Sequence, residues 1–290
     1  MVASNYSNAY SEEKLSVPQH SPFYEVIAGF YGARNGSPEP VSKKLLPHYQ
    51  SMLVFTFGHG VKVHLPSNHP EVHCLSASGE ANGDFPLGKY LLLGPVKKVL
   101  SYTLQPYSSM LVVNFRSDGL FRYFGPAFFQ SANTMLSPEV ITDEPCFTLL
   151  WEQLQRLNTL QEKAGLILNF SAPYLRKPNK VMTSLLATDA LPAVKAAAAS
   201  LQQSVRNVQI TYKKHMGYSV NSLARFQRFI KATEIIAEAA AHTPTKELWF
   251  EIIETLGYHD QSQLIHDFKY FLAITPMAYL QLQQYYCKVT

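Results

Sequence analysis

The sequence predicts an α+β protein of more than one domain, with a β-rich first half and an all-helical second half. The chain has 290 residues, which is enough for about two domains of ordinary size. Over residues 1–140, short runs of branched and aromatic residues alternate with Gly, Pro and Asn, as strands and turns do. From about residue 143 the apolar residues recur instead at helical spacing.

The composition is that of a chain that can bury real cores without entering a membrane. It is 47% hydrophobic and 16% charged, with a mean hydropathy of −0.08. No apolar run reaches the roughly 18 residues of a membrane helix, and the first residues lack the pattern of a secretory signal. The chain has three cysteines, an odd number, and they lie far apart in the sequence: Cys74, Cys146 and Cys287. Both features argue against a disulfide framework. We therefore expect a cytoplasmic protein with no membrane partner.

The first half predicts a barrel or sandwich over residues 1–140. Strand-like runs such as "SMLVFTF", "KYLLLGP" and "SSMLVVNF" follow one another at regular spacing. An aromatic-lined barrel is a natural site for a small, largely apolar effector. Core packing is the alternative role for each candidate lining residue; the candidates are Phe55, Phe57, Tyr90, Tyr102 and Phe115.

Residues 141–178 predict a helical segment that couples the two halves or dimerises. Two apolar stripes at helical spacing indicate an αα unit, and we expect them to pack against a second copy of the chain. The stripes consist of Phe147, Leu150, Leu154 and Leu157, then Leu160, Ala164, Leu168 and Leu175. Two prolines then interrupt the pattern, so residues 176–192 are predicted to be mostly linker.

The remainder, residues 179–290, predicts two pairs of short helices joined by one long helix. Ser204 can cap a helix that Gly217 ends, and Ser219 can begin the long one. Asp260 can cap the helix "QSQLIHDFKYFL", and Pro276 can stand in the first turn of the last helix. The order of elements is that of a duplicated helix-turn-helix.

The charge distribution favours an anionic partner. The net charge is only +4, but no acidic residue occurs between Asp189 and Glu234. A block of one sign within a helical region is a typical footprint for a polyphosphate. Its cations are Lys195, Arg206, Lys213, Lys214, Arg225, Arg228 and Lys231.

The helix after Ser204 combines an apolar face with a face suited to a DNA major groove. At 100° per residue, Val205, Val208 and Tyr212 share one side. Arg can bridge guanine O6 and N7, and Asn or Gln can bridge adenine N6 and N7. The alternative is the solvated face of an ordinary amphipathic helix. The outer set consists of Gln203, Arg206, Asn207, Ile210, Lys213 and Lys214.

The helix after Asp260 repeats this arrangement with less positive charge. Leu264, Phe268 and Phe271 share its inner face, and its outer face carries Gln263, His266 and Tyr270, with Lys269 at the flank. From Lys246 to Lys269, the two lysines stand against Glu247, Glu251, Glu254, Asp260 and Asp267. As a reader of DNA, this second half is expected to be the weaker one electrostatically.

The stretch "LGYHDQSQLIHDFKYFLAITPMAYL" resembles the C-terminal signature of the AraC/XylS family of transcription regulators. The family pattern has a Gly-aromatic pair, Asp-x-Ser, Asp-Phe-Lys and Thr-Pro-x-x-Tyr. Residues 204–229, "SVRNVQITYKKHMGYSVNSLARFQRF", look like the family's first helix-turn-helix, and the likeness covers about 190–286. The chain departs from the family at Ile210, His266 and Ala273. The matching signature residues are Gly257, Tyr258, Asp260, Ser262, Asp267, Phe268, Lys269, Thr275, Pro276 and Tyr279.

This resemblance implies a cupin-like sensory domain followed by a DNA-binding domain whose two recognition helices enter successive segments of one major groove. The expected partners are promoter DNA, a small-molecule effector and RNA polymerase; no cofactor, metal or catalytic residue is expected. Phosphate contacts are expected from Lys213, Lys214, Arg225, Arg228 and Lys269. Base contacts are expected from Gln203, Arg206, Asn207, Gln263 and His266.

Two other functions remain open on the sequence alone. A metal-dependent cupin enzyme would draw on the histidines of the first half, with Glu71 or Glu80 to complete a site. However, no His-x-His pair stands on a predicted strand, so loop or structural roles are favoured. A helical interaction module that does not bind DNA is the second alternative, because the last helices are acidic. The histidines concerned are His48, His59, His64, His69 and His73.

Overall fold

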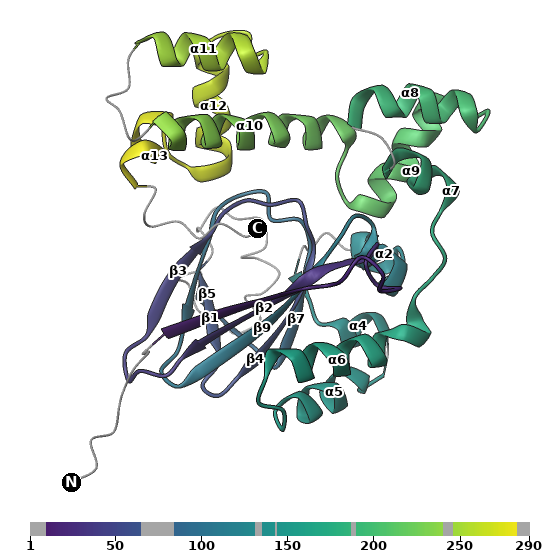
Figure 1. Ribbon diagram of the computed structural model, residues 1–290, viewed down its shortest axis with the longest axis vertical. Coiled ribbons are helices and arrows are strands. Elements are labelled where there is room, and N and C mark those ends of the chain that lie inside the picture. Colours follow the sequence, from purple (N-terminus) through teal and green to yellow (C-terminus); the bar gives the residue numbers. More distant parts are fainter. Residues whose placement is uncertain are drawn as a thin grey trace.

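The computed structural model describes residues 10–64, 84–130, 135–142, 144–186, 190–239 and 246–282 (Figure 1). Antiparallel β-sheets form the first part of the chain, and helices form the second. This confirms the α+β class and the order of its two parts. Within the described ranges, no helix is long and apolar enough to cross a bilayer.

The larger sheet has six strands in the order β1-β2-β9-β4-β7-β10, and every neighbouring pair is antiparallel. Non-consecutive neighbours such as β2 and β9 give it the long-range pairings of a folded-over sandwich. Its strands are β1 (Tyr10–Ser16), β2 (Ile27–Asn35), β4 (Met52–Phe57), β7 (Tyr90–Leu93), β9 (Ser108–Phe115) and β10 (Met135–Leu136).

The smaller sheet has four strands in the order β3-β8-β5-β6, also antiparallel. It faces the inner side of the larger sheet, and Val61, Val63 and Tyr102 from it join Val54 and Val112 in one buried cluster. The two sheets therefore enclose a common interior. The strands are β3 (Val41–Leu45), β5 (Val61–His64), β6 (Asp84–Leu87) and β8 (Leu100–Leu104).

Strand β4 has an almost entirely apolar sequence because both of its faces are buried. All six of its residues are buried, because each face of the sheet is covered. Met52 and Val54 belong to the cluster between the sheets, whereas Leu53 and Phe55 belong to a second cluster on the outer face. This alternation follows from the period of two along a strand.

Short helices cover that outer face. Phe147, Leu150 and Leu154 are buried there together with Phe55, and Thr159 begins the next helix with a reciprocal cap to Glu162. The elements are α2 (Gly119–Phe124), α3 (Ala127–Gln130), α4 (Pro138–Thr142), α5 (Cys146–Leu154), α6 (Leu160–Ser171) and the 3₁₀ turn η2 (Ala172–Tyr174).

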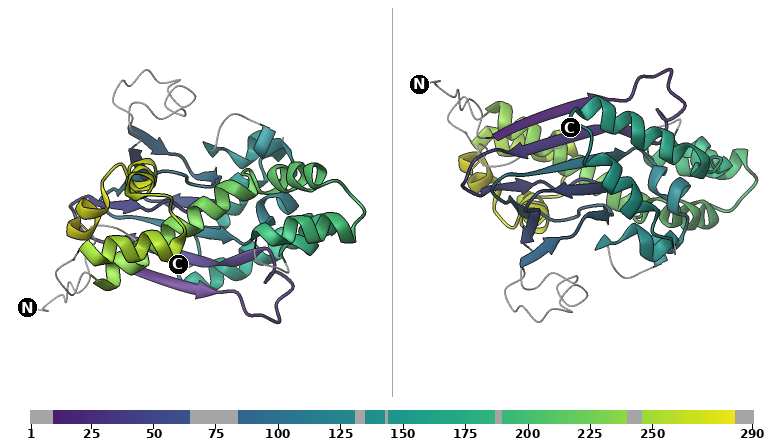
Figure 2. Two further views of the ribbon diagram at one scale, coloured as in Figure 1. Left: turned by 90° about the horizontal axis from the view of Figure 1, so that it is seen from above. Right: turned by 90° about the horizontal axis from the view of Figure 1, so that it is seen from below.

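The apolar stripes of α5 and α6 are therefore used within the chain. Leu160, Ala164 and Ile167 are also buried in the outer-face cluster, and the view from below shows both helices lying across the sheet (Figure 2). The expected dimerisation through 143–175 loses its basis, because the sheet already covers the side chains that were to meet a second copy. Residue 143 itself lies outside the described residues.

The second part is a row of helices with the long helix α10 as its spine (Figure 1). One group of helices lies at each end of α10, which matches the predicted duplicated arrangement. The helices are α7 (Lys180–Leu186), α8 (Ala190–Ser200), α9 (Val205–Met216), α10 (Val220–Ala239), α11 (Lys246–Leu256), α12 (Gln261–Leu272) and α13 (Pro276–Leu282).

The predicted linker over 176–192 is too long. Helix α7 lies inside it and buries Val181, Met182 and Leu185 against α8 and α9. A stretch that looked irregular because of its flanking prolines therefore contains the first helix of the helical part.

The predicted helix ends are confirmed at α9 and α12. The Ser204 hydroxyl accepts a hydrogen bond from the Asn207 amide at 3.1 Å, and Gly217 follows α9 with φ 77°. The Asp260 carboxylate accepts from the Gln263 amide at 2.8 Å. Ala273 takes the left-handed position after α12 at φ 60°, where glycine is the residue without a steric cost.

Candidate nucleic-acid interface and ligand cavity

Helix α9 presents the surface that the sequence predicted. Val208 and Tyr212 are buried beneath it, although Val205, expected on the inner side, is 41% exposed. The whole outer set is exposed to solvent, and Ile210 in its centre is 55% exposed. The set consists of Gln203, Arg206, Asn207, Ile210, Lys213 and Lys214.

The charged groups of this face are free to meet a partner. Across the described ranges, no ion pair involves Arg206, Lys213 or Lys214. The Asn207 side chain donates a long hydrogen bond from Nδ2 to Gln203 Oε1 at 3.5 Å, which aligns the two side-chain amides on the surface. Two lysines in the last turn place positive charge beside one guanidinium and two amides, the groups that contact phosphates and base edges.

Helix α12 has the predicted inner face but a different outer one. Leu264, Phe268 and Phe271 are buried. The Gln263 side chain accepts a hydrogen bond from the His259 amide at 2.8 Å, and so completes the cap at the start of the helix. His266 Nδ1 lies 3.2 Å from Arg225 Nη2. Gln263 and His266, the two α12 residues expected to contact bases, thus both have partners within the chain.

Arg225 and Arg228 of α10 converge on one buried carboxylate of α12. Arg225 Nε lies 2.7 Å from Asp267 Oδ1, and Arg228 Nη2 lies 3.5 Å from Asp267 Oδ2, while Asp267 is 1% exposed. The Arg228 guanidinium also lies 4.3 Å from the centre of the Tyr258 ring. The structure gives these two arginines, expected to contact phosphates, a role in holding α12 against α10.

Sequence reasoning placed Asp267 in the family signature but missed this role. A signal was available: Asp267 lies three residues after Leu264 and four before Phe271, on the inner face of α12. A carboxylate on a buried helical face needs a partner of opposite charge. Arg225 and Arg228, spaced by three residues on α10, supply it.

The remaining positive charge gathers on the first half of the helical part. Of the seven cations in the acid-free stretch, Asp267 offsets two, and the other five are exposed. Lys269 of α12 is exposed as well. The cations of this stretch that remain without an ion pair therefore lie mainly on α8 and α9. The five are Lys195, Arg206, Lys213, Lys214 and Lys231.

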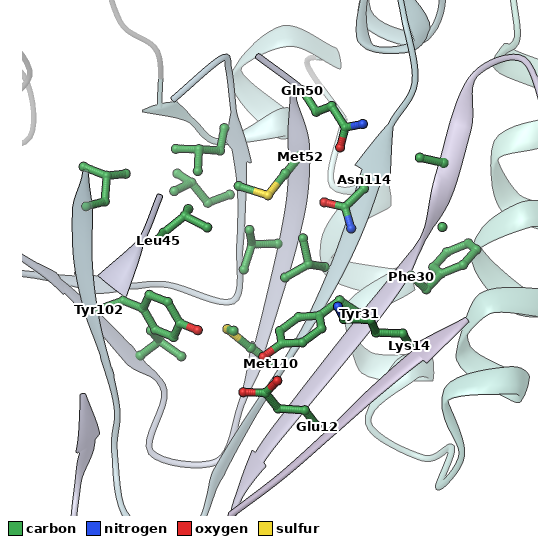
Figure 3. Close-up of a pocket in the computed structure, with 18 of the residues that line it drawn as sticks. Glu12, Lys14, Phe30, Tyr31, Leu45, Gln50, Met52, Tyr102, Met110 and Asn114 are labelled. Atoms are coloured by element: carbon green, nitrogen blue, oxygen red, sulfur yellow. The ribbon is translucent and has the colours of Figure 1, made fainter. Parts of the chain in front are cut away.

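A cavity of about 450 Å³ lies between the two sheets (Figure 3). Its walls are mainly aliphatic and thioether side chains, among them Met52, Val54, Leu93, Met110 and Val112. The volume lies within the range of sites for small ligands.

Only one of the five aromatic candidates lines this cavity. Tyr102 reaches it from β8. The other four lie on the outer face of the larger sheet, packed with α5, α6 and their neighbours, because they have the opposite parity along their strands. Those four are Phe55, Phe57, Tyr90 and Phe115.

Polar residues line the cavity at several points, with Glu12 towards one end, Gln50 and Asn114 towards the other, and Lys14 on the wall between them (Figure 3). At one end Glu12 pairs with Lys43 at 3.6 Å and accepts a hydrogen bond from the Tyr10 hydroxyl. Burial opposes the ionised form, but hydrogen bonds from Tyr10 and Tyr31 and the nearby Lys43 lower the pKa of Glu12. At the other end are Gln50, Asn114 and Arg116.

The helical part contacts the sandwich at the end where Gln50 lies, through two connections between strands. In the β3–β4 connection, the Tyr49 ring lies 4.5 Å from those of Tyr218 and Phe226, so it contacts both helix-turn-helix clusters. In the β7–β8 connection, the Val99 amide donates to the Phe271 carbonyl at 3.0 Å. The cavity-lining residues Gln50 and Leu100 directly follow these contacts in the chain.

A second contact joins α9 to α2. His215 Nδ1 lies 3.3 Å from Asp118 Oδ2, with both residues buried, and its ring stacks on Phe121 at 3.7 Å between centroids. A Cβ at Gly217 would approach the Phe129 ring to 2.6 Å, so this position needs glycine for space as well as for its φ. Helix α9 therefore packs on the first part of the chain through its C-terminal end.

The candidate histidines that the structure describes do not converge on one site. His48 is buried, His59 Nδ1 lies 2.8 Å from the Pro106 carbonyl, and His64 Nε2 lies 2.7 Å from the Thr103 hydroxyl. No group of three or more His, Cys, Asp or Glu among the described residues could hold a metal ion. His69, His73, Glu71 and Glu80 lie outside the described residues.

Comparison with known proteins yields structural neighbours but no sequence relatives. No protein-family model and no curated protein matches the chain. ToxT from Vibrio cholerae aligns with a TM-score of 0.37 and 12% identity over 95% of this chain and 99% of that one. ToxT bound to (E)-4-(8-methylnaphthalen-1-yl)but-3-enoic acid gives 0.37 and 10%, over 95% and 99%. Oxalate oxidase gives 0.25 and 11%, over 59% and 74%.

Proposed function

We propose that this chain is a sequence-specific DNA-binding transcription regulator of the AraC/XylS type. The observation that carries the proposal is the outer face of α9, where a guanidinium, two lysines and two amides are exposed above a buried apolar face. That combination is suited to phosphates and base edges, and a helix-turn-helix presents it to a major groove. The signature around α12 supports the same assignment.

Within this proposal the two recognition helices have unequal tasks. Helix α9 reads bases through Arg206, Asn207 and Gln203 and contacts phosphates through Lys213 and Lys214. Helix α12 contributes Lys269 to the backbone and positions the second unit, since Gln263 and His266 have partners within the chain. RNA polymerase is a further partner that a regulator of this type would meet at promoters.

The cavity between the sheets is the proposed effector site. It is largely apolar and lies between two sheets, and its lining residues Gln50 and Leu100 directly follow Tyr49 and Val99, which contact the helical part. An effector that shifts Gln50 or Leu100 would act on Tyr49 and Val99, and through them on α10 and α12.

The test begins with selection of bound fragments from genomic DNA, followed by affinity measurements on the best fragment. Arg206→Ala should weaken binding to that fragment by about 1–3 kcal/mol while changing binding to unrelated DNA much less, if Arg206 pairs with a guanine. Lys213→Ala should weaken binding to all sequences alike and flatten the dependence on salt by about one phosphate contact. Lys177→Ala, an exposed cation outside α9, is the control that should behave as wild type.

Two results would overturn the proposal. One is the absence of any preferred fragment at low salt, where phosphate contacts are strongest. The other is a preferred fragment whose affinity is unaffected by Arg206→Ala and by Lys213→Ala.

A further inference from the structure

The β7–β8 connection brings a lysine of the first part of the chain to the C-terminal end of α12. The Val99 amide of this connection donates a hydrogen bond to the Phe271 carbonyl at 3.0 Å. Lys98, the preceding residue, places its ammonium 5.9 Å from the centre of the Tyr270 ring. A cation that belongs to the β-rich part therefore lies beside the last turn of the second helix proposed to contact DNA.

Helices α9 and α12 have the same length and the same kinds of ends, so their residues correspond one to one. Each has 12 residues between a capping side chain and a left-handed end residue. Counted from the caps, Lys213 of α9 corresponds to Lys269 of α12, and Lys214 corresponds to Tyr270. Helix α12 thus lacks the second of the two lysines in the last turn of α9, and Lys98 stands beside the residue that replaces it.

The charge of Lys98 is not used up within the part of the chain that the structure describes. No ion pair there involves Lys98 or Lys269. The contact with the Tyr270 ring orients the Lys98 ammonium but does not neutralise it. Tyr270 is 37% exposed and Lys269 is exposed, so this end of α12 is open to a partner.

A third cation lies at the same ring but is already neutralised. The Arg225 guanidinium is 4.5 Å from the centre of the Tyr270 ring, and its charge is taken up by the buried carboxylate of Asp267. The positive charge that this end of α12 offers to an anionic partner therefore comes from Lys269 and Lys98.

Both helices rest on the first part of the chain through the same end. Helix α9 does so through His215 and Gly217, and α12 does so through Tyr270 and Phe271. A recognition helix reads base edges from its N-terminal residues, and cations elsewhere on it meet the sugar–phosphate backbone. The first part of the chain is therefore next to the ends of both helices at which backbone contacts are expected.

We propose that Lys98 contacts a DNA phosphate beside the segment read by α12, in the place that Lys214 takes beside the segment read by α9. The β-rich part then supplies a share of the DNA-binding surface as well as the cavity. This inference rests on the proposed function and extends it to a residue outside the helical part.

The test measures the salt dependence of binding by the full chain to the best fragment from the genomic selection. Lys98→Met keeps an apolar stem over the Tyr270 ring and removes the charge, whereas Lys98→Arg keeps both. Loss of one phosphate contact should lower the slope of log affinity against log salt by about 0.9, and should weaken binding about three- to tenfold at about 0.1 M salt. Lys98→Arg should retain the slope, as should the control Lys62→Ala, an exposed cation on β5.

Uncharged methylphosphonates, placed one at a time along the fragment, locate the contact. The phosphate that Lys98 meets should matter about three- to tenfold for wild-type protein and less than about twofold for Lys98→Met. The same scan with Lys214→Ala should identify a different phosphate about 10 base pairs away, because the two helices are proposed to lie in major-groove segments one helical turn apart.

Three results would overturn the inference while the regulator stands, since the fragment is still bound and Arg206→Ala still weakens binding. A wild-type salt slope in Lys98→Met, even with a lower unfolding midpoint, would reduce Lys98 to a packing role. Tighter DNA binding by Lys98→Met would show that the lysine opposes DNA. A lower slope with no single phosphate losing its effect would leave only a diffuse field. The absence of any preferred fragment, in contrast, would remove the regulator and this contact together.

Discussion

At the scale of single residues, a few buried polar groups decide how this chain is held together. Asp267 anchors two arginines, His215 meets Asp118 between the two parts of the chain, and His48 is buried beside the loop that carries Tyr49. Each of these roles depends on a partner far along the chain or on burial by another element.

Asp267→Asn should destabilise the second helix-turn-helix. The substitution leaves Arg225 and Arg228 without their counter-charge, and a broken buried pair typically costs about 3–5 kcal/mol. The arginines are partly exposed, so water offsets part of the loss and about 2 kcal/mol is expected. Chemical denaturation measures it, with Asp260→Asn as a control that retains capping ability at an exposed position. An unchanged unfolding midpoint would show that the two ion pairs contribute nothing.

His48 should make stability depend on pH. Burial lowers the pKa of its imidazole to about 4, below the value of about 6.5 in an unfolded chain. As pH falls the unfolded chain takes up the proton first, so the stabilisation is complete above about pH 6.5 and is lost progressively towards pH 4. The loss attributable to this group is about 3 kcal/mol at most. His48→Leu should flatten the pH dependence of the unfolding free energy in that window, and parallel curves for the two proteins would contradict the assignment.

At the scale of elements, helices α9 and α12 have similar ends and different surfaces. Both begin with a side-chain cap and end in a left-handed residue, at Gly217 and Ala273. Helix α9 leaves its amides and cations exposed, whereas α12 uses Gln263 in its cap and His266 beside Arg225. The polar side chains of α9 therefore face solvent, whereas those of α12 at comparable positions make hydrogen bonds within the chain.

Gln263→Ala should lower stability more than it alters DNA preference. It removes the acceptor for the His259 amide at the start of α12, and loss of one such cap contact costs about 0.5–1 kcal/mol. Thermal unfolding and binding to the selected fragment are measured together, with the exposed neighbour Gln261→Ala as control. Wild-type stability combined with a changed base preference at one position would return Gln263 to the set of base contacts.

At the scale of the whole molecule, the helical part rests on the mouth of the cavity-bearing sandwich (Figures 1 and 2). Tyr49 contacts the clusters of both helix-turn-helix units, and Val99 is hydrogen-bonded to α12. Two residues of the proposed effector site, Gln50 and Leu100, are therefore chain neighbours of residues that contact the helical part.

Tyr49→Ala should uncouple the two sites. Removal of the ring takes away its contacts with Tyr218 and Phe226 and leaves the cavity lining intact. Ligand affinity should stay within about threefold of wild type, while the ligand-dependent change in DNA affinity, about 1–3 kcal/mol for a typical coupled pair of sites, should largely disappear. Tyr107→Ala, an exposed aromatic residue far from this contact in the fold, is the control. A fully retained ligand effect would exclude Tyr49 as the link.

The sequence by itself determined the α+β fold class, the helices that begin at the caps Ser204 and Asp260, and the exposed face of α9. These features depend on periodicity and on contacts within a few residues, which a linear pattern records. Only the tertiary structure decided which side of each strand faces the cavity, that α5 and α6 cover the chain's own sheet, and that Asp267 takes up two arginines. Those outcomes depend on which elements meet in space, since a side chain is buried or free according to neighbours that lie far along the chain.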